Sequence, residues 1–282
     1  MTLQLVADYK TENPNTQIVY QCAPGIASVM GNLMKQAGVD EVIGTDMPMS
    51  SDHQYNLIGY PLAEGYPEKP MKKHLLQYFA DELGIKRPGR GLTLLKPERH
   101  DTYCTVHVQA GWSQYKNWDF KKWEMVCTYL REQGIKVYQI GGADDYKLKN
   151  VDGLWCGRSF DENLEVLGGA RVHMGVDSWT NHATNINWLD KNGATSKVPA
   201  VILWGSTQPS AAGYEHNTNL WLGLRCQPCF REDPKISRMS RGVCPNPSGQ
   251  TYENPKHDCM AGISPQQVIN AVWRLCVRGE EA

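Results

Sequence analysis

The chain has 282 residues, 41% of them hydrophobic, and a formal net charge of −1 at pH 7. No run approaches the roughly 20 apolar residues that cross a bilayer, no secretory signal peptide is expected at its start, and the near-neutral charge argues against a dedicated nucleic-acid binder. The length suits two domains, and we expect a soluble, cytoplasmic protein.

The first hundred residues predict a small α/β half that opens with a helix. Apolar residues at helical spacing begin at Leu3, and Pro14 ends the pattern. Residues 86–100 carry prolines and glycines between basic residues, which predicts an interdomain linker. Between this helix and the linker, the pattern predicts strands at 17–22, 41–44 and 55–60 and helices at 28–37 and 72–83. We therefore expect domains at 1–100 and 101–282.

A lysine follows the first predicted strand of the second half. Residues 105–108 predict that strand, and Lys116 lies in the loop before a predicted helix. In open α/β sheets ligands bind beyond the carboxyl ends of the strands, where an ammonium group can neutralise a phosphate. The alternative is an ordinary solvated surface lysine. The helix carries one apolar stripe, formed by Phe120, Trp123, Cys127 and Leu130.

The next predicted strand, residues 136–140, ends in two glycines and two acids. Gly142 lets a ligand approach the backbone closely, and the carboxylate of Asp144 can accept hydrogen bonds from ribose hydroxyls. Gly-Gly and Asp-Asp pairs also favour a plain turn without any ligand, so both interpretations stay open.

An apolar strand predicted at residues 172–176 breaks abruptly at Asp177 and Ser178, where a helix is expected to start. Ser178 and the backbone N–H groups of the first helical turn can donate to phosphate oxygens, and the helix dipole adds positive potential. His182, one turn further on, can serve as a second donor. The pattern is compatible with a nucleotide diphosphate site, although an ordinary helix cap is the commoner reason for an Asp-Ser pair.

Four cysteines form the most specific spacing in the chain. Cys226 and Cys229 make a Cys-x-x-Cys pair, and Cys244 and Cys259 each follow after fourteen residues. Because this Pro- and Gly-rich stretch cannot bury a core of its own, the four thiolates predict one structural zinc or iron in a loop at 226–260. Two disulfides are the alternative, but the other five cysteines are scattered through predicted buried elements, which suits a reducing compartment.

The end of the chain predicts a structural helix. It begins with a capping box, Ser264-Pro265-Gln266-Gln267. One face of this helix is apolar and carries Val268, Val272 and Leu275.

From about Cys104 to Leu275, the chain resembles glycosyltransferase family 9. This family contains the heptosyltransferases of bacterial lipopolysaccharide cores, with autotransporter-modifying and phage relatives. The motifs keep the family's order. They are the phosphate loop from Trp112-Ser113 to Lys116-x-Trp118, the ribose turn Gly142-Ala143-Asp144, the signature Asp177-Ser178-Trp179-Thr180-Asn181-His182, the segment from Leu203 to Pro209, and the cysteine set.

The resemblance implies an α/β enzyme of the GT-B fold, with two Rossmann-like domains facing a cleft. The N-terminal domain would bind the acceptor and the C-terminal domain a nucleotide-diphosphate sugar, and catalysis would need no divalent metal. Lys116, the helix start at Ser178 and Ser113 would stabilise the leaving diphosphate, with His182 supporting this loop or donating to the diphosphate. The implied donor-binding residues are Ser113, Lys116, Gly142, Asp144, Asp177, Ser178, Trp179, Thr180 and His182, with Lys116 and His182 as catalytic residues.

Two departures from the family pattern bear on substrate and mechanism. Trp179 stands where the family has glycine, which should reshape the donor pocket, so the donor can differ from ADP-heptose while an ADP-sugar stays favoured. The N-terminal half is reduced and lacks the family's first strand, together with the Gly-Asp loop that carries its expected general base. Nothing in the spacing selects one base among the carboxylates in plausible loops, which are Asp46, Asp52 and Glu64.

The acceptor is the least defined partner. A saccharide or lipid-linked acceptor is favoured over a protein hydroxyl or a modified base in phage DNA. Two groups of basic residues could meet phosphates of a lipid core or of DNA. They are Arg231, Lys235, Arg238 and Arg241 in the cysteine loop, and Lys69, Lys72, Lys73 and His74 earlier in the chain. A noncatalytic interaction module derived from a transferase is the alternative of another class, which the missing first strand favours.

Overall fold

The computed structural model of the protein describes residues 1–48, 51–55, 73–89, 91–98, 101–111, 113–229 and 257–278. Its contacts divide the chain into two compact units. The N-terminal unit comprises Met1–Lys96, Ser159–Asp161 and Ile186–Ser196, and the C-terminal unit comprises Pro97–Arg158, Glu162–Asn185 and Lys197–Ala282. Within the described ranges, no helix is long and apolar enough to cross a membrane.

The N-terminal unit begins with the helix that the apolar spacing predicts. Helix α1 buries Leu5 completely and packs against α4. Strands β1 and β2 pair in parallel and confirm the strands predicted at 17–22 and 41–44, whereas nearly all of the predicted strand at 55–60 lies outside the described residues. The elements are α1 (Thr2–Glu12), β1 (Val19–Cys22), α2 (Pro24–Gln36), β2 (Glu41–Gly44), α4 (Leu75–Glu82), β3 (Thr93–Leu95), β8 (Asn187–Leu189) and β9 (Thr195–Ser196).

The stretch predicted as a linker, 86–100, contains strand β3. Its three residues pair in parallel with β8, which comes from a distant part of the chain, and β8 pairs with β9 in antiparallel. So short a strand has little local signal of its own, and its pairing with β8 supplies the backbone hydrogen bonds that define it.

The C-terminal unit is built on a six-stranded sheet with the order β11-β10-β7-β4-β5-β6, in which every pair is parallel. Strands β4, β5 and β7 confirm the strands predicted at 105–108, 136–140 and 172–176. The elements are β4 (Tyr103–His107), the 3₁₀ turn η1 (Gln114–Lys116), α5 (Phe120–Glu132), β5 (Lys136–Gln139), β6 (Gly153–Leu154), α6 (Phe160–Gly168), β7 (Val172–Val176), α7 (Trp179–Ala183), β10 (Ala200–Leu203), α8 (Pro209–Ala212), β11 (Thr218–Leu220), α9 (Asp258–Ala261) and α10 (Pro265–Arg278).

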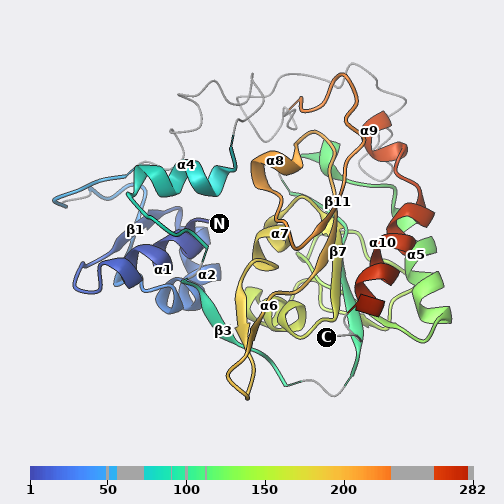
Figure 1. Ribbon diagram of the computed structural model, residues 1–282, viewed down its shortest axis with the longest axis horizontal. Coiled ribbons are helices and arrows are strands. Elements are labelled where there is room, and N and C mark those ends of the chain that lie inside the picture. The colour runs from blue at the N-terminus through green and yellow to red at the C-terminus, as the bar shows by residue number, and fades with distance from the viewer. Residues whose placement is uncertain are drawn as a thin grey trace. The chain divides into compact units, whose positions relative to one another are not determined.

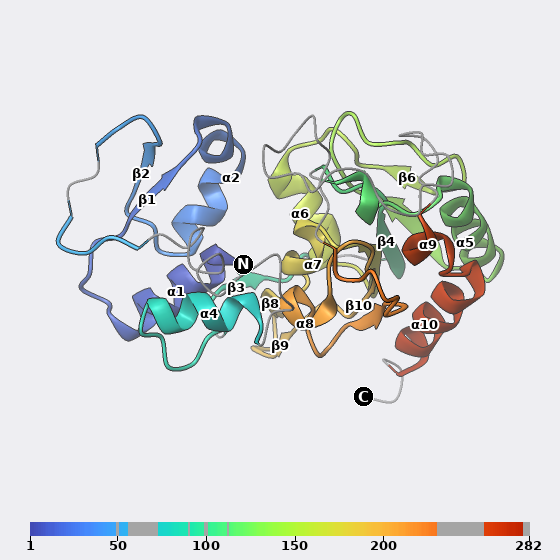
Figure 2. The ribbon, with the colours of Figure 1, turned by 90° about the horizontal axis from the view of Figure 1, so that it is seen from above.

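Helices cover both faces of this sheet. Helices α5 and α10 lie side by side on one face, and α6 and α7 lie on the other (Figures 1 and 2). Strands β4, β7 and β10 are buried along their whole length, as parallel strands between two helical layers must be. Ser264 and Gln267 form the predicted capping box of α10: the Gln267 N–H donates to Ser264 Oγ at 3.3 Å, and the Ser264 N–H donates to Gln267 Oε1 at 2.8 Å.

Two tryptophans beside the predicted donor loop belong to the core. Trp118 and Trp123 are completely buried, and their ring centroids lie 4.8 Å apart in an edge-to-face arrangement. The indole N–H of Trp118 donates to the carbonyl of Ile263 at 3.1 Å, which ties the start of α5 to the segment before α10. Their burial is explained by packing and does not require a sugar.

The order of the strands determines where a ligand is expected. From β4 the chain moves to β5 and β6 on one side, and it then returns to β7, β10 and β11 on the other side. This is a doubly wound order, and in such sheets ligands bind beyond the carboxyl ends of the two strands where the direction reverses. Here those strands are β4 and β7.

Candidate functional site

Three polar residues lie at the carboxyl edge of the six-stranded sheet, where the strand order predicts a ligand site. Strand β4 ends at His107, Asp177 directly follows β7, and Thr207 lies in the segment after β10. His107 is in register with Gly175, so β4 and β7 end nearly level. The topology therefore gathers side chains that are far apart in sequence.

Lys116 and Asp177, which follow different strands, form an ion pair. The ammonium of Lys116 donates to Oδ2 of Asp177 at 2.8 Å, and the hydroxyl of Thr207 donates to the same oxygen at 2.7 Å. The side chain of Asp177 is 6% exposed and that of Lys116 is 20% exposed. Lys116 is therefore no solvated surface lysine. Its ammonium has three donors, so two remain beyond the bond to Asp177 for a ligand.

The carboxylate of Asp177 is kept charged by its neighbours. Burial raises the pKa of Asp177, but the charge of Lys116, the hydrogen bonds from Lys116 and Thr207, and the proximity of His182 together hold that pKa below its ordinary value. Because folding lowers this pKa, the interaction stabilises the fold above the ordinary pKa of aspartate, and the stabilisation is lost as the pH falls through the folded value.

Ser178 occupies the N-cap position of α7, but its hydroxyl makes no cap bond. Its Oγ lies 2.9 Å from Nδ1 of His107 and 3.0 Å from Oγ1 of the buried Thr180. A simple helix cap therefore does not explain this side chain. Helix α7 has only five residues, so its dipole contributes less positive potential for an anion than the sequence pattern suggested. Nearby side chains must supply the remaining attraction.

The indole of Trp179 flanks the same place. It is half-buried and stands edge-on to the ring of His107, with centroids 5.8 Å apart and an angle of 65° between the rings. The bulky residue at the family's glycine position thus lies against His107 and directly follows Ser178.

His182 lies on α7 and contacts Tyr214. Its Nδ1 is 3.0 Å from the Tyr214 hydroxyl. Burial, and then the charge of Asp177, raise the pKa of Tyr214, so this phenol keeps its proton at neutral pH. The charge of His182 also contributes to lowering the pKa of Asp177.

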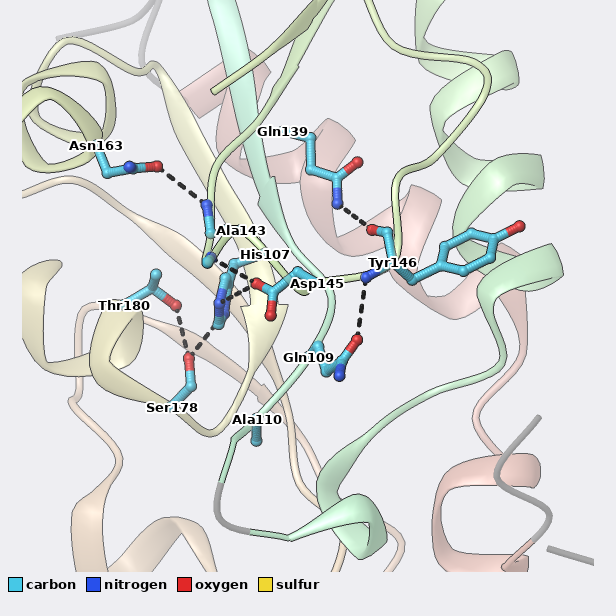
Figure 3. Close-up of polar contacts among 12 residues, drawn as sticks. His107, Gln109, Ala110, Gln139, Ala143, Asp145, Tyr146, Asn163, Ser178 and Thr180 are labelled. Atoms are coloured by element: carbon cyan, nitrogen blue, oxygen red, sulfur yellow. Dashed lines mark hydrogen bonds and ion pairs between the residues drawn. The ribbon is translucent and has the colours of Figure 1, made fainter. Parts of the chain in front are cut away.

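The turn after β5 directs Asp145 toward β4. Its Oδ2 accepts a hydrogen bond from the Gly142 N–H at 2.9 Å and lies 3.4 Å from Nε2 of His107 (Figure 3). Asp144, the acid predicted to bind ribose, is exposed. The carboxylate that this turn brings to the sheet edge is thus one residue further along the chain.

Ser113 is buried at the start of η1, where its hydroxyl accepts a hydrogen bond from the Tyr115 N–H at 3.3 Å. It therefore caps the short turn that carries Lys116. Trp112, the first residue of the predicted phosphate loop, lies outside the described residues.

The described residues do not assemble the predicted metal site. Cys226 and Cys229 are half-buried and Cys259 is buried. Within the described ranges, no three histidine, cysteine or acidic side chains lie close enough together to hold one ion. The fourth predicted ligand, Cys244, lies outside those ranges.

Three polar residues of this edge were not among the predicted site residues: His107, Asp145 and Thr207. A sequence signal existed for His107, since it is a titratable residue at the carboxyl end of an apolar strand. Asp145 and Asp144 both follow the two glycines after the same strand, so the sequence does not distinguish them. The path of the turn decides which of the two reaches His107. Thr207 lies in the segment from Leu203 to Pro209 that carries the family resemblance.

Comparison with known proteins identifies the class of fold. No family model matches the sequence, and no curated protein matches it. Solved structures do match: the fold is that of the GT-B heptosyltransferases and other members of glycosyltransferase family 9.

Three of the similar structures cover nearly all of this chain. The iron-containing dodecameric glycosyltransferase TibC of enterotoxigenic E. coli is 16% identical with a TM-score of 0.64, over 97% of this chain and 73% of that one. A family 9 glycosyltransferase of Veillonella parvula is 16% identical with a TM-score of 0.61, over 98% and 93%. The E. coli ADP-heptose lipopolysaccharide heptosyltransferase II is 14% identical with a TM-score of 0.59, over 100% and 95%.

Removing the Lys116 charge from the ion pair with Asp177 should lower the stability of the fold in a pH-dependent way. Lys116→Met leaves the buried Asp177 carboxylate without its cation, and we expect a loss of about 2 kcal/mol in the free energy of unfolding at pH 7. The loss should shrink at acidic pH, because the pKa of the unpaired, buried carboxyl rises and the group becomes neutral. Urea unfolding between pH 4 and 8 measures both effects.

The double variant Lys116→Met/Asp177→Asn provides the matched control. It removes both charges, and we expect it to recover most of the lost stability. Lys121→Met, on the exposed side of α5, should leave stability unchanged. A pH-independent loss in the single variant would contradict the pairing.

Proposed function

We propose that the protein is a glycosyltransferase that moves a sugar from a nucleotide-diphosphate sugar to an acceptor hydroxyl, in the manner of the heptosyltransferases. One observation carries the proposal. Lys116, Asp177, Ser178 and Thr207 converge beyond the carboxyl ends of β4 and β7, where a doubly wound sheet binds its ligand.

The chemistry of these residues suits a leaving diphosphate. When the bond to the sugar breaks, negative charge grows on the diphosphate oxygens, and preorganised donors stabilise this charge. Lys116 would supply an ammonium whose orientation is fixed by Asp177, and Ser178 a hydroxyl. His182 would support this arrangement through Tyr214 and Asp177. These groups need no metal ion to act as charge stabilisers.

An adenine nucleotide is the favoured donor. A second TibC structure, with a TM-score of 0.66 at 16% identity, is described as a complex with ADP-D-β-D-heptose. Trp179, which lies beside His107, would reshape the part of such a site that holds the sugar. The sugar can therefore be heptose or a different sugar.

A saccharide or lipid-linked acceptor remains the favoured partner. Of the basic residues that could have met phosphates, Lys73 is paired with Asp81 and His74 caps α4, accepting from the Leu76 N–H at 3.0 Å. Lys69, Lys72 and the four basic residues of the cysteine loop lie outside the described residues. The described part of the chain therefore adds no support for DNA as the acceptor.

A thermal-shift screen against ADP-, UDP-, GDP- and CMP-sugars tests the donor site. A ligand at one hundred times its Kd stabilises the folded state by about 2.7 kcal/mol, which corresponds to a rise of roughly 5 °C in Tm for a chain of this size. We expect nucleotide sugars with one particular base to give this shift. In water without an acceptor, the protein should also slowly hydrolyse the matching nucleotide sugar and release the nucleoside diphosphate.

The double variant Lys116→Met/Asp177→Asn is the matched control, since we expect it to keep the fold while it lacks the ammonium. It should show no shift. If no nucleotide sugar stabilises the wild-type protein, the transferase proposal is wrong. Binding without any turnover, once acceptors have been supplied, would favour the noncatalytic interaction module.

We further propose that Cys226, Cys229, Cys244 and Cys259 bind one zinc or iron, for which the cysteine spacing and the iron-containing TibC are the support. Metal analysis of the purified protein should find about one equivalent per chain. Cys226→Ser/Cys229→Ser should lose it, whereas Cys22→Ser should keep it. Metal-free wild-type protein with the same Tm as the untreated sample would contradict this proposal.

A further inference from the structure

His107 has a partner on each of its ring nitrogens. Its side chain is 3% exposed at the last position of β4. Nε2 lies 3.4 Å from the carboxylate of Asp145, and Nδ1 lies 2.9 Å from the hydroxyl of Ser178 (Figure 3). An acid, an imidazole and a hydroxyl thus form a continuous polar chain that ends at the proposed diphosphate position.

Buried amides hold the turn that carries Asp145. The Gly141 N–H donates to Asn163 Oδ1 at 3.0 Å, and the Tyr146 N–H donates to Gln109 Oε1 at 3.1 Å. Gln139, which is completely buried, donates to the carbonyl of Tyr146 at 2.6 Å (Figure 3). Because both ends of the turn are fixed, the carboxylate has little freedom to leave His107.

Gly141 leaves the space in which the carboxylate meets the imidazole. Its φ is +152°, and a Cβ built on it would lie 2.2 Å from Oδ2 of Asp145 and 3.2 Å from Cδ2 of His107. Any side chain here would displace the carboxylate. A glycine at position 141 is therefore needed for Asp145 to contact His107.

Ser178 has a single hydroxyl hydrogen, and the protonation state of His107 decides whether that hydrogen is available to a ligand. A neutral His107 that keeps its proton on Nε2, facing Asp145, presents a lone pair at Nδ1, so Ser178 must donate to it. A doubly protonated His107 donates from Nδ1 to Ser178 Oγ instead, and the hydroxyl hydrogen becomes available to a ligand. As long as Nε2 keeps its proton toward Asp145, only the cationic form lets Ser178 serve as a donor to an anion.

The neighbours of His107 that the structure describes, other than Asp145, are neutral or paired. His173, on the neighbouring β7, is completely buried; burial, and then the proximity of His107, lower the pKa of His173 well below its ordinary value, so it is neutral. Burial and the charge of Asp145 raise the pKa of Cys156 to about 11, so this thiol is also neutral. Trp179 contributes an uncharged ring edge, and the nearby pair of Lys116 and Asp177 balances itself.

We propose that His107 is a positioning residue that takes up a proton when a nucleoside diphosphate binds and thereby turns the Ser178 hydroxyl toward the diphosphate. The proton comes from solvent and is held at Nδ1, no other bond is made or broken, and Asp145 stabilises the resulting imidazolium. The inference rests on the proposed function, because the nucleoside diphosphate is the ligand that the site would bind.

Isothermal titration with ADP tests the proposal through proton uptake. Binding heats in two buffers of different ionisation enthalpy give the number of protons taken up, measured from pH 5.5 to 8.5, the range over which histidine changes charge. The terminal phosphate of ADP also titrates in this range, so the difference between wild type and His107→Asn is the informative quantity. Asn is polar but uncharged and cannot titrate, so it cannot supply the imidazolium.

We expect uptake of up to one more proton in the wild type than in His107→Asn, and ADP affinity about tenfold lower in the variant at the acid end only. Asp145→Asn, at a half-buried position, should lower the extra uptake without loss of the fold. His53→Asn, at an exposed position in the other unit, should match the wild type.

The outcomes separate the two proposals. ADP that binds with the same uptake in wild type and His107→Asn would overturn the role of His107 and leave the donor site standing. No binding of ADP or of any nucleotide sugar to the wild type would overturn the proposed function itself. A uniform loss of affinity at every pH in His107→Asn, with unchanged uptake, would mark a merely structural histidine.

Discussion

The buried ion pair between Lys116 and Asp177 is the constraint around which the candidate site is arranged. A carboxylate this deeply buried stays charged only because an ammonium and a hydroxyl reach it, so Thr207 and Lys116 are held at the end of β7. The same contact orients the lysine's remaining donors. In the proposed site, stability and donor binding would therefore depend on one interaction, and only a variant that removes both charges can separate them.

The sheet explains why these residues meet. Parallel strands align their carboxyl ends, and the order β6-β5-β4-β7-β10-β11 puts the change of direction between β4 and β7. His107 ends one of these strands and Ser178 follows the other, so their hydrogen bond spans this point. Because α7 has only five residues, the polarity of this edge comes from side chains more than from a helix dipole.

Much of the C-terminal unit could be predicted from the sequence, because apolar periodicity is strong in β4, β5, β7 and α5. The place of Lys116, Asp177 and Ser178 at this sheet edge was predictable, since each follows a strand. Their pairing was not, because contact between side chains depends on strand register. The selection of Asp145 over Asp144 depends on the backbone of Gly141, and β3 exists through its pairing with β8. Such features arise from tertiary structure and leave little local signal.

The most direct test is a crystal structure of the protein with the nucleotide sugar that raises its Tm. If Lys116 and Ser178 bind the donor, the diphosphate lies beyond β4 and β7, within hydrogen-bond distance of Lys116 Nζ and Ser178 Oγ, while Asp177 still accepts from Lys116 and Thr207. A nucleotide bound elsewhere on the chain, with the contacts of Lys116 and Ser178 unchanged, would contradict it.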